Sequence, residues 1–181
     1  MVRVGAFDAI DRKVELIRGE LVEMNPAGPI HGDLIIYLTN WSVRNCDPKV
    51  SLVSSQTDLE LREQQSRPEP DVMWLRSARY RDNHPQAADV QLAIEVADSS
   101  LVRDLEDKRK LYAEAGIVEY WIVDAQANCI HVNRHPEAGE YTSRTVYKSP
   151  EKITPSICQT ALLDLADLFD EPRSGREEAR G

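Results

Sequence analysis

The stretch DVQLAIEVADSSLVRDLEDKRKLYAEAGIVEYWIVDA, residues 89–125, decides the fold. Its first part, residues 89–98, is a short apolar run of the kind that forms a buried central strand. Residues 99–116 continue with helical periodicity and charged flanks, and Gly116 stands where a helix would end. Residues 118–125 form a second apolar run. This order predicts a βαβ unit with a right-handed crossover, in which the two strands are parallel.

A further helix is predicted upstream, starting near His31. Leu34, Leu38, Trp41 and Ser42 recur at helical spacing, so they share a face that would pack against the sheet. Alternating apolar residues and turn signals predict the remaining elements. These are a hairpin that turns at Arg18-Gly19 and ends at Pro26, strands within 50–62 and 71–76, a loop at 79–89, an edge hairpin of 129–136 and 140–148, and a short helix at 160–169. The chain is therefore expected to be an α/β protein with a mixed sheet.

The length of 181 residues, with 41% apolar and 29% charged side chains, is typical of one globular domain. We expect that domain to span residues 1–170 and residues 171–181 to form a disordered tail. Cys46, Cys129 and Cys158 are widely spaced, which argues against a disulfide framework or a zinc ribbon. No apolar stretch approaches the ~20 residues of a membrane span, and no signal sequence is recognised. The expected location is a reducing cytoplasm.

The net charge is −9, from 22 basic and 31 acidic residues. This charge repels polyphosphates at long range, and the sequence contains no basic helix or zinc module that would read DNA. A nucleic-acid partner would therefore have to be bound through local features of a site.

Two charged residues fall at apolar positions of the βαβ unit. Glu95 lies on the first central strand, on a face that it shares with alanines. An unpaired buried carboxylate is costly, so Glu95 needs a cation, a hydrogen-bond donor or a solvent cleft. Lys108 falls in the middle of the apolar stripe of the following helix, and Asp104 lies one turn earlier, within i,i+4 reach.

A third charge, Asp71, follows Glu69-Pro70 at the start of a strand. Acids from loops at strand ends can converge with a carboxylate on the neighbouring strand. Asp71 and Glu95 would then offer oxygen ligands for Mg²⁺, with the Lys108 ammonium close by. This combination suits phosphodiester hydrolysis, because a metal polarises the phosphate and activates water while the ammonium offsets developing charge. The cation would also reverse the local repulsion of a polyanion.

Structural interpretations of the same residues stay open. Asp71 could cap the start of its strand, and Glu95 and Lys108 could form an ion pair that only holds the fold together. His31 could be a cap histidine of the first helical turn instead of a ligand or a base.

Other aromatic and histidine residues receive plainer interpretations. Tyr120 and Trp121 are interpreted as packing residues of the second central strand. The remaining histidines have no spacing that suggests a metal site; they are His84, His131 and His135.

The run IEVADSSLVRDLEDKRKLYAEAGIVEYWIVD at 94–124, with RPEPDV at 67–72 and ELIRGELVEMNPAGPIHGDL at 15–34, resembles the Uma-two family. This is a group of proposed restriction endonucleases in the PD-(D/E)XK nuclease superfamily. The most specific element is the string D-x-x-x-K-x-x-x-Y-x-x-x-G-x-x-E-Y-W-x-x-D, matched from Asp104 to Asp124. The resemblance extends from about Val14 to Phe169.

The resemblance implies a restriction-endonuclease-like core and an endonuclease that cleaves DNA with Mg²⁺ or Mn²⁺. It makes Asp71, preceded by Pro70, the aspartate of the motif and Glu95 its strand glutamate, both as metal ligands. The usual lysine of the superfamily would stand at Ala97, whereas in this family the following helix supplies it, which matches Lys108.

Four further positions carry less defined implications. Asp104 would orient Lys108, and His31, which matches a family histidine, would contact substrate or water. Glu20 lies in the E-L-I-x-G-E-L stretch of the family without an assigned role. The chain has Asp98-Ser99-Ser100 where members commonly have S-P-S, a departure that concerns the local turn and not the metal site.

Two other functions remain possible from the sequence. One is a non-catalytic binding or scaffold domain that keeps the nuclease fold and uses the ion pair structurally. The other is a nuclease that acts on RNA. A homodimer is an expectation as well, because double-strand cleavage needs two active sites.

Overall fold

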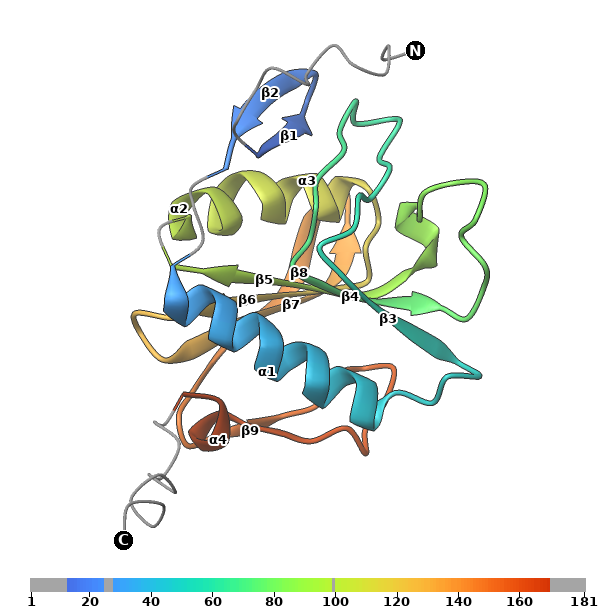
Figure 1. Cartoon of the computed structure of the whole chain (residues 1–181). Coiled ribbons are helices and arrows are strands. Elements are labelled where there is room, and N and C mark those ends of the chain that lie inside the picture. Colours follow the sequence, from blue (N-terminus) through green and yellow to red (C-terminus); the bar gives the residue numbers. More distant parts are fainter. Residues whose placement is uncertain (1–12, 25–27, 99, 170–181) are drawn as a thin grey trace, which may run out of the picture.

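In the computed structural model, residues 13–24, 28–98 and 100–169 are described. A six-stranded sheet forms the centre of the molecule, in the order β3-β4-β5-β6-β7-β8 (Figure 1). The strands are β3 (Ser51–Ser55), β4 (Val72–Arg76), β5 (Val90–Ala97), β6 (Glu119–Asp124), β7 (Cys129–Glu137) and β8 (Glu140–Lys148). β5 and β6 are parallel and every other neighbouring pair in this sheet is antiparallel. The predicted βαβ unit and edge hairpin are therefore present.

Helix α1 (Pro29–Asn45) covers one face of the sheet (Figure 1). It begins two residues before His31, with a proline in its first turn, where the missing N–H costs no hydrogen bond. Its buried residues include all four that helical spacing placed on the packing face. Trp41 packs on two tryptophans of the sheet, with ring centroids 5.6 Å from Trp74 and 6.0 Å from Trp121. Trp121 is therefore a packing residue, as predicted.

The other face carries the helical crossover between β5 and β6. It consists of α2 (Leu101–Arg103), a π-helical segment η2 (Asp104–Lys108) and α3 (Arg109–Glu114). Gly116 follows with φ of +81°, a left-handed conformation that ends the helix at the predicted residue. Tyr112 and Tyr120 meet edge to face beneath this crossover, with centroids 4.8 Å apart. Both tyrosines are fully buried, so Tyr120 is also a packing residue.

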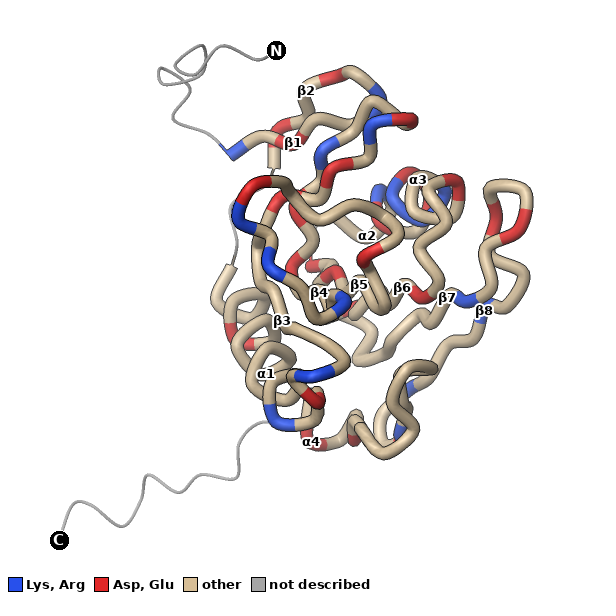
Figure 2. The backbone as a smooth tube through the Cα atoms, turned by 90° about the vertical axis from the view of Figure 1, so that its right-hand side faces the viewer, with Lys and Arg blue, Asp and Glu red and all other residues tan. Residues whose placement is uncertain are grey.

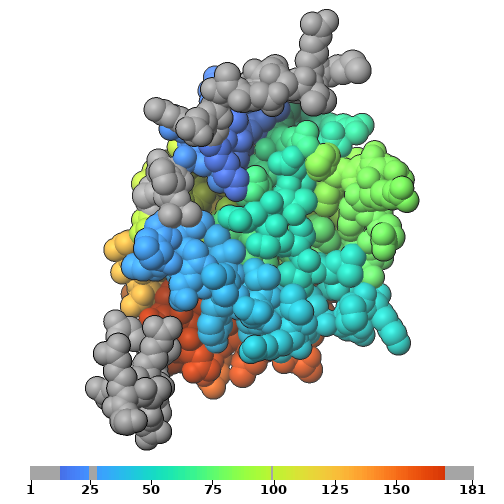
Figure 3. All heavy atoms as spheres, viewed as in Figure 1, coloured from blue at the N-terminus to red at the C-terminus, as the bar shows by residue number. Residues whose placement is uncertain are grey.

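The N-terminal hairpin, β1 (Val14–Ile17) and β2 (Glu20–Glu23), is a separate two-stranded sheet. Arg18 and Gly19 both have positive φ, 52° and 82°, as a tight two-residue hairpin turn requires. The Arg67 N–H donates to the carbonyl of Leu16 at 2.6 Å, which ties the hairpin to the segment 59–69. In Figure 3 the hairpin lies beside that segment, with α1 below them.

Three predicted elements differ in extent. The strand expected within 50–62 ends at Ser55, since Leu59 and Leu61 are buried in a loop that turns back on itself. The 79–89 loop contains a short 3-10 turn, η1 (Ala87–Asp89). The helix expected at 160–169 is only α4 (Leu165–Phe169), because the two residues of β10 (Leu163–Asp164) pair with β9 (Lys152–Ile153). Pro26 and the predicted tail lie outside the described residues. None of the described helices is long and apolar enough to cross a membrane.

Candidate active site

Lys108 lies at the centre of a buried cluster of charges. Its Nζ atom is 3.0 Å from Glu95 Oε1 and 3.0 Å from Glu15 Oε1. The Tyr112 hydroxyl donates to the same Glu95 oxygen at 2.9 Å. The side chains of the lysine and both acids are at most 5% exposed. Sequence reasoning placed Glu95 and Lys108 on facing elements, and the structure brings them into contact.

The π-helical segment η2 positions Lys108. Asp104 and Lys108 are its first and last residues, and both are buried although the segment also carries exposed acids. Tyr112 is one turn further along and buried on the same side. π-helical turns occur frequently at functional sites, where the wider turn re-aims side chains. Here three polar side chains of one helical crossover point into the layer between helix and sheet.

Asp71 lies directly before β4, next to β5. Its Oδ2 atom accepts a hydrogen bond of 2.8 Å from the backbone N–H of Val96, the residue after Glu95. The same oxygen is 3.4 Å from His31 Nε2, which comes from the first turn of α1. Asp71 therefore lies at the start of β4 and Glu95 lies on the adjacent antiparallel strand β5, while His31 comes from α1 on one face of the sheet.

Asp104 is buried in the same region without touching the lysine. Its carboxylate accepts a hydrogen bond of 2.5 Å from the Ser100 hydroxyl. Among the described residues no ion pair joins Asp104 to Lys108, whose ammonium contacts Glu15 and Glu95 instead. Asp104 acts on Lys108 through charge at longer range, because it contributes to the raised pKa of the ammonium.

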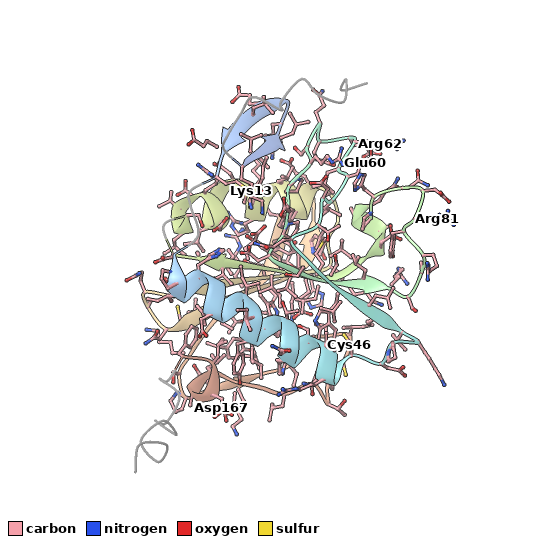
Figure 4. The ribbon with its side chains drawn as sticks, viewed as in Figure 1. Lys13, Cys46, Glu60, Arg62, Arg81 and Asp167 are labelled. Carbon is pink, nitrogen blue, oxygen red and sulfur yellow. The ribbon has the colours of Figure 1, made fainter. Side chains whose placement is uncertain are left out.

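Glu15 was not identified as a site residue from the sequence. It is the first glutamate of the E-L-I-R-G-E-L stretch, whereas Glu20, the one singled out by the resemblance, is exposed on β2. Glu15 Oε1 also accepts the backbone N–H of Glu69 at 2.8 Å. Lys13, labelled in Figure 4, forms an ion pair with the Glu69 side chain at the same junction. An acid between apolar neighbours in a predicted strand was the available signal.

The cluster holds more acidic than basic groups. Burial raises the pKa of Glu95 well above its ordinary range, Lys108 opposes this rise, and the neighbouring carboxylates add to it. Burial also raises the pKa of Asp104. Burial alone would lower the pKa of Lys108, but Glu95, Glu15 and Asp104 outweigh it and raise that pKa. Glu15, Glu95, Asp71 and Asp104 are thus four buried carboxyl groups around one buried ammonium that contacts only the first two, and the cluster has capacity for a further cation.

Asp71 changes the pKa of its neighbour His31. The hydrogen bond with Asp71 raises the pKa of the imidazole, while burial works in the opposite direction. Its second ring nitrogen, Nδ1, is buried and has no hydrogen-bond partner among the described residues. Buried polar atoms normally have partners, so Nδ1 marks a place where a water molecule or a ligand would be accommodated.

The oxygen donors of Asp71 and Glu95 fit a hard divalent cation. Mg²⁺ binds through one or two carboxylates and keeps several waters, so it does not require a complete cage of protein ligands. The neighbouring carboxyl groups that raise the pKa of Glu95, together with the unpartnered His31 Nδ1, agree with a cation and its waters in this region. Asp71 and Glu95 are the residues that could hold it.

A mixed sheet with helices on both faces and buried acids around one lysine defines an α/β protein with a nuclease-like fold. A similar fold occurs in a crystallised protein from Anabaena variabilis ATCC 29413, described as a putative nuclease belonging to DUF820. The TM-score is 0.69 at 15% identity, over 86% of this chain and 89% of the other.

The model of the Uma2 family, described as "Putative restriction endonuclease", matches residues 6–166, and the chain belongs to this family. No curated protein matches the chain. The predicted family and the predicted fold class are both confirmed.

Proposed function

We propose that the protein is a Mg²⁺-dependent endonuclease that hydrolyses phosphodiester bonds of DNA, with Asp71 and Glu95 as the metal ligands. The observation that carries this proposal is the buried Glu95–Lys108 pair, with Asp71 bonded to the Val96 N–H at the start of the adjacent strand. Membership of a family of proposed restriction endonucleases supports the reaction class.

A Mg²⁺ ion held by Asp71 and Glu95 would polarise a phosphodiester and lower the pKa of a bound water. Lys108 keeps its proton across the neutral range, because three nearby carboxylates raise its pKa. Its ammonium can therefore offset negative charge on the phosphate as the transition state forms. Glu15 and Tyr112 hold this arrangement, the first on the ammonium and the second on the Glu95 carboxylate.

Asp71 is oriented by the Val96 N–H, which leaves its other oxygen available as a ligand. His31 would contact substrate or water on the side of its unpartnered Nδ1. Asp104, which was expected to orient Lys108, would act on it by charge and not by direct contact, since its carboxylate is bonded to the Ser100 hydroxyl.

The rival function is a non-catalytic scaffold that retains the fold. Two observations favour it: both carboxylate partners of Lys108 are already in place, and basic positions are interleaved with acidic ones along the backbone (Figure 2). A structural ion-pair cluster would look the same around Lys108. Metal affinity separates the two functions, because a purely structural cluster has no reason to bind Mn²⁺.

The first experiment is a calorimetric titration of Mn²⁺ into the protein, with Asp71→Asn and Glu95→Gln beside it. Asp107→Asn, an exposed acid of η2, is the matched control. Saturable binding that is lost in both site variants and kept in the control supports the proposed site. If Mn²⁺ does not bind, either alone or with a phosphorothioate oligonucleotide present, the scaffold function is favoured.

The second experiment offers matched DNA and RNA oligonucleotides with Mg²⁺. Cleavage of DNA that disappears with EDTA and with Glu95→Gln supports the proposal, and cleavage of RNA alone assigns the substrate to the other polymer. Light scattering during the reaction tests the expectation of a homodimer.

A further inference from the structure

A second set of metal-ligand side chains lies at the turn between β6 and β7. Asp124 is the last residue of β6 and Cys129 the first of β7, and the antiparallel register places them directly opposite each other. His131 is two residues along β7, so it shares the face of Cys129. One ligand atom from each of the three lies within 4.8 Å of the others. Cys129 Sγ is 3.8 Å from His131 Nε2.

The spacing of these three residues in the sequence does not indicate a metal site. Cys129 and His131 alone have no metal-type motif, and sequence reasoning set both aside. The third ligand type comes from across the hairpin, at Asp124, and only the strand register shows that it is close.

The turn holds the carboxylate in a fixed position. Asp124 Oδ1 accepts the backbone N–H groups of Gln126 at 3.0 Å and Ala127 at 2.9 Å. A carboxylate offers about four lone-pair positions, so two turn hydrogen bonds leave acceptor capacity for a ligand bond. The pairing of β6 with β7 continues from Asp124 to Glu119, which fixes the relative positions of the three side chains.

The surroundings leave room for additional ligands. Cys129 is a free thiol and 3% exposed, whereas His131 is half-buried and lines a cavity of about 350 Å³. Asn133 and Glu106 line the same cavity.

The donor set selects the kind of metal. Thiolate and imidazole ligands favour Zn²⁺ and related transition metals, whereas Mg²⁺ prefers oxygen ligands only. Three protein ligands with a fourth position open to water are a common arrangement for Zn²⁺. We propose that Asp124, Cys129 and His131 bind a Zn²⁺-class ion, next to the cavity that His131 lines. The thiol proton is released to solvent on binding. This site shares no ligand with the proposed Mg²⁺ site.

The test uses Co²⁺ as a spectroscopic substitute for Zn²⁺ in the full chain. Thiolate coordination produces a sulfur-to-cobalt charge-transfer band in the near ultraviolet, which carboxylate and imidazole ligands do not give. We expect the wild type to show this band at one equivalent of Co²⁺, and added Zn²⁺ to remove it. Cys129→Ala and Cys129→Ser should abolish the band, and His131→Gln should weaken Zn²⁺ binding at least about tenfold.

Two control variants and a thermal measurement make the result specific. Cys158→Ser removes a free thiol elsewhere and should leave the band unchanged, and Asp71→Asn should leave it unchanged because that residue belongs to the other site. Zn²⁺ should also raise the Tm of the wild type but not that of Cys129→Ala, since binding to the folded state stabilises it. Absence of the band in the wild type, or its persistence in a folded Cys129 variant, would overturn the proposal.

Discussion

Glu15 and Lys108 stand 93 positions apart in the chain and meet at 3.0 Å. Through this contact the N-terminal hairpin supplies one wall of a cluster whose other members belong to the βαβ unit. The Glu69 N–H donates to the same Glu15 oxygen, so the carboxylate joins three segments of the chain. A hairpin outside the main sheet is therefore part of the candidate active site.

Replacement of this carboxylate by an amide should weaken the fold. Glu15→Gln keeps an acceptor for the Glu69 N–H, but it removes the negative charge that pairs with the buried Lys108 ammonium. We therefore expect the free energy of unfolding to fall by about 1.5–3 kcal/mol. Urea unfolding at neutral pH measures it. The matched control is Glu20→Gln, which alters an exposed acid of the same hairpin and should change stability by less than about 0.5 kcal/mol. Equal effects of the two changes would show that the 3.0 Å contact contributes nothing specific.

Removal of the buried ammonium should abolish the proposed cleavage. Lys108→Ala takes away the charge that offsets the phosphate, and we expect cleavage to fall at least about 10²-fold. The control is Lys110→Ala, an exposed lysine two residues further along the crossover. Because Lys108→Ala leaves two carboxylates unpaired, circular dichroism must first show that the variant is folded. Unchanged metal-dependent cleavage by folded Lys108→Ala would remove this residue from the mechanism.

The elements around this site follow closely from the sequence, and the reasons are local. The alternation of residues 90–97, the helical stripe around Lys108 and Gly116 at the end of the crossover each constrain one element without knowledge of the rest. Glu95 and Lys108 could be paired in advance because both lie within one βαβ unit. Glu15 could not, since its position depends on how the hairpin docks on segment 59–69, which no short pattern specifies.

A similar limit applies inside the helical crossover. Ideal α-helical geometry puts Asp104 and Lys108 within pairing distance at i,i+4. The π-helical turn changes the angle between the two side chains around the helix axis, and the Asp104 carboxylate instead accepts a hydrogen bond from the Ser100 hydroxyl. A single wider turn thus alters a contact while leaving the burial of both residues unchanged.

The imidazole of His31 should titrate above its ordinary value of 6.5, because the hydrogen bond with Asp71 raises its pKa. The contribution of this contact to the free energy of unfolding is complete below pH 6.5, where the imidazole is protonated in the folded and the unfolded chain. It is lost as the pH rises through the raised pKa of the folded protein. Asp71→Asn should move the His31 titration towards 6.5. NMR titration of the imidazole signals measures this shift. The His131 signal, whose pKa burial lowers, serves as the internal reference. An unaltered His31 titration in Asp71→Asn would contradict the pairing.

Two glycines should respond to alanine with opposite signs. Gly116 has φ of +81° with open space around a new Cβ, so Gly116→Ala should cost about 1–2 kcal/mol through backbone conformation alone. Gly32 lies in the first turns of α1, also with open space, and Gly32→Ala should stabilise by about 0.5–1 kcal/mol. Thermal unfolding of both variants gives the comparison. Equal signs would mean that the helix end at Gly116 rearranges.

The three tryptophans of the chain, Trp41, Trp74 and Trp121, all belong to the cluster beneath α1. The buried charges around Lys108 lie on the opposite face of the sheet, where the packed aromatic residues are tyrosines. Indole fluorescence consequently senses one half of the interior only. Loosening of the hairpin or of the helical crossover would pass unseen in an emission scan, while far-ultraviolet dichroism would register it. Coincidence of the two melting curves would show that both halves of the interior unfold as one cooperative unit.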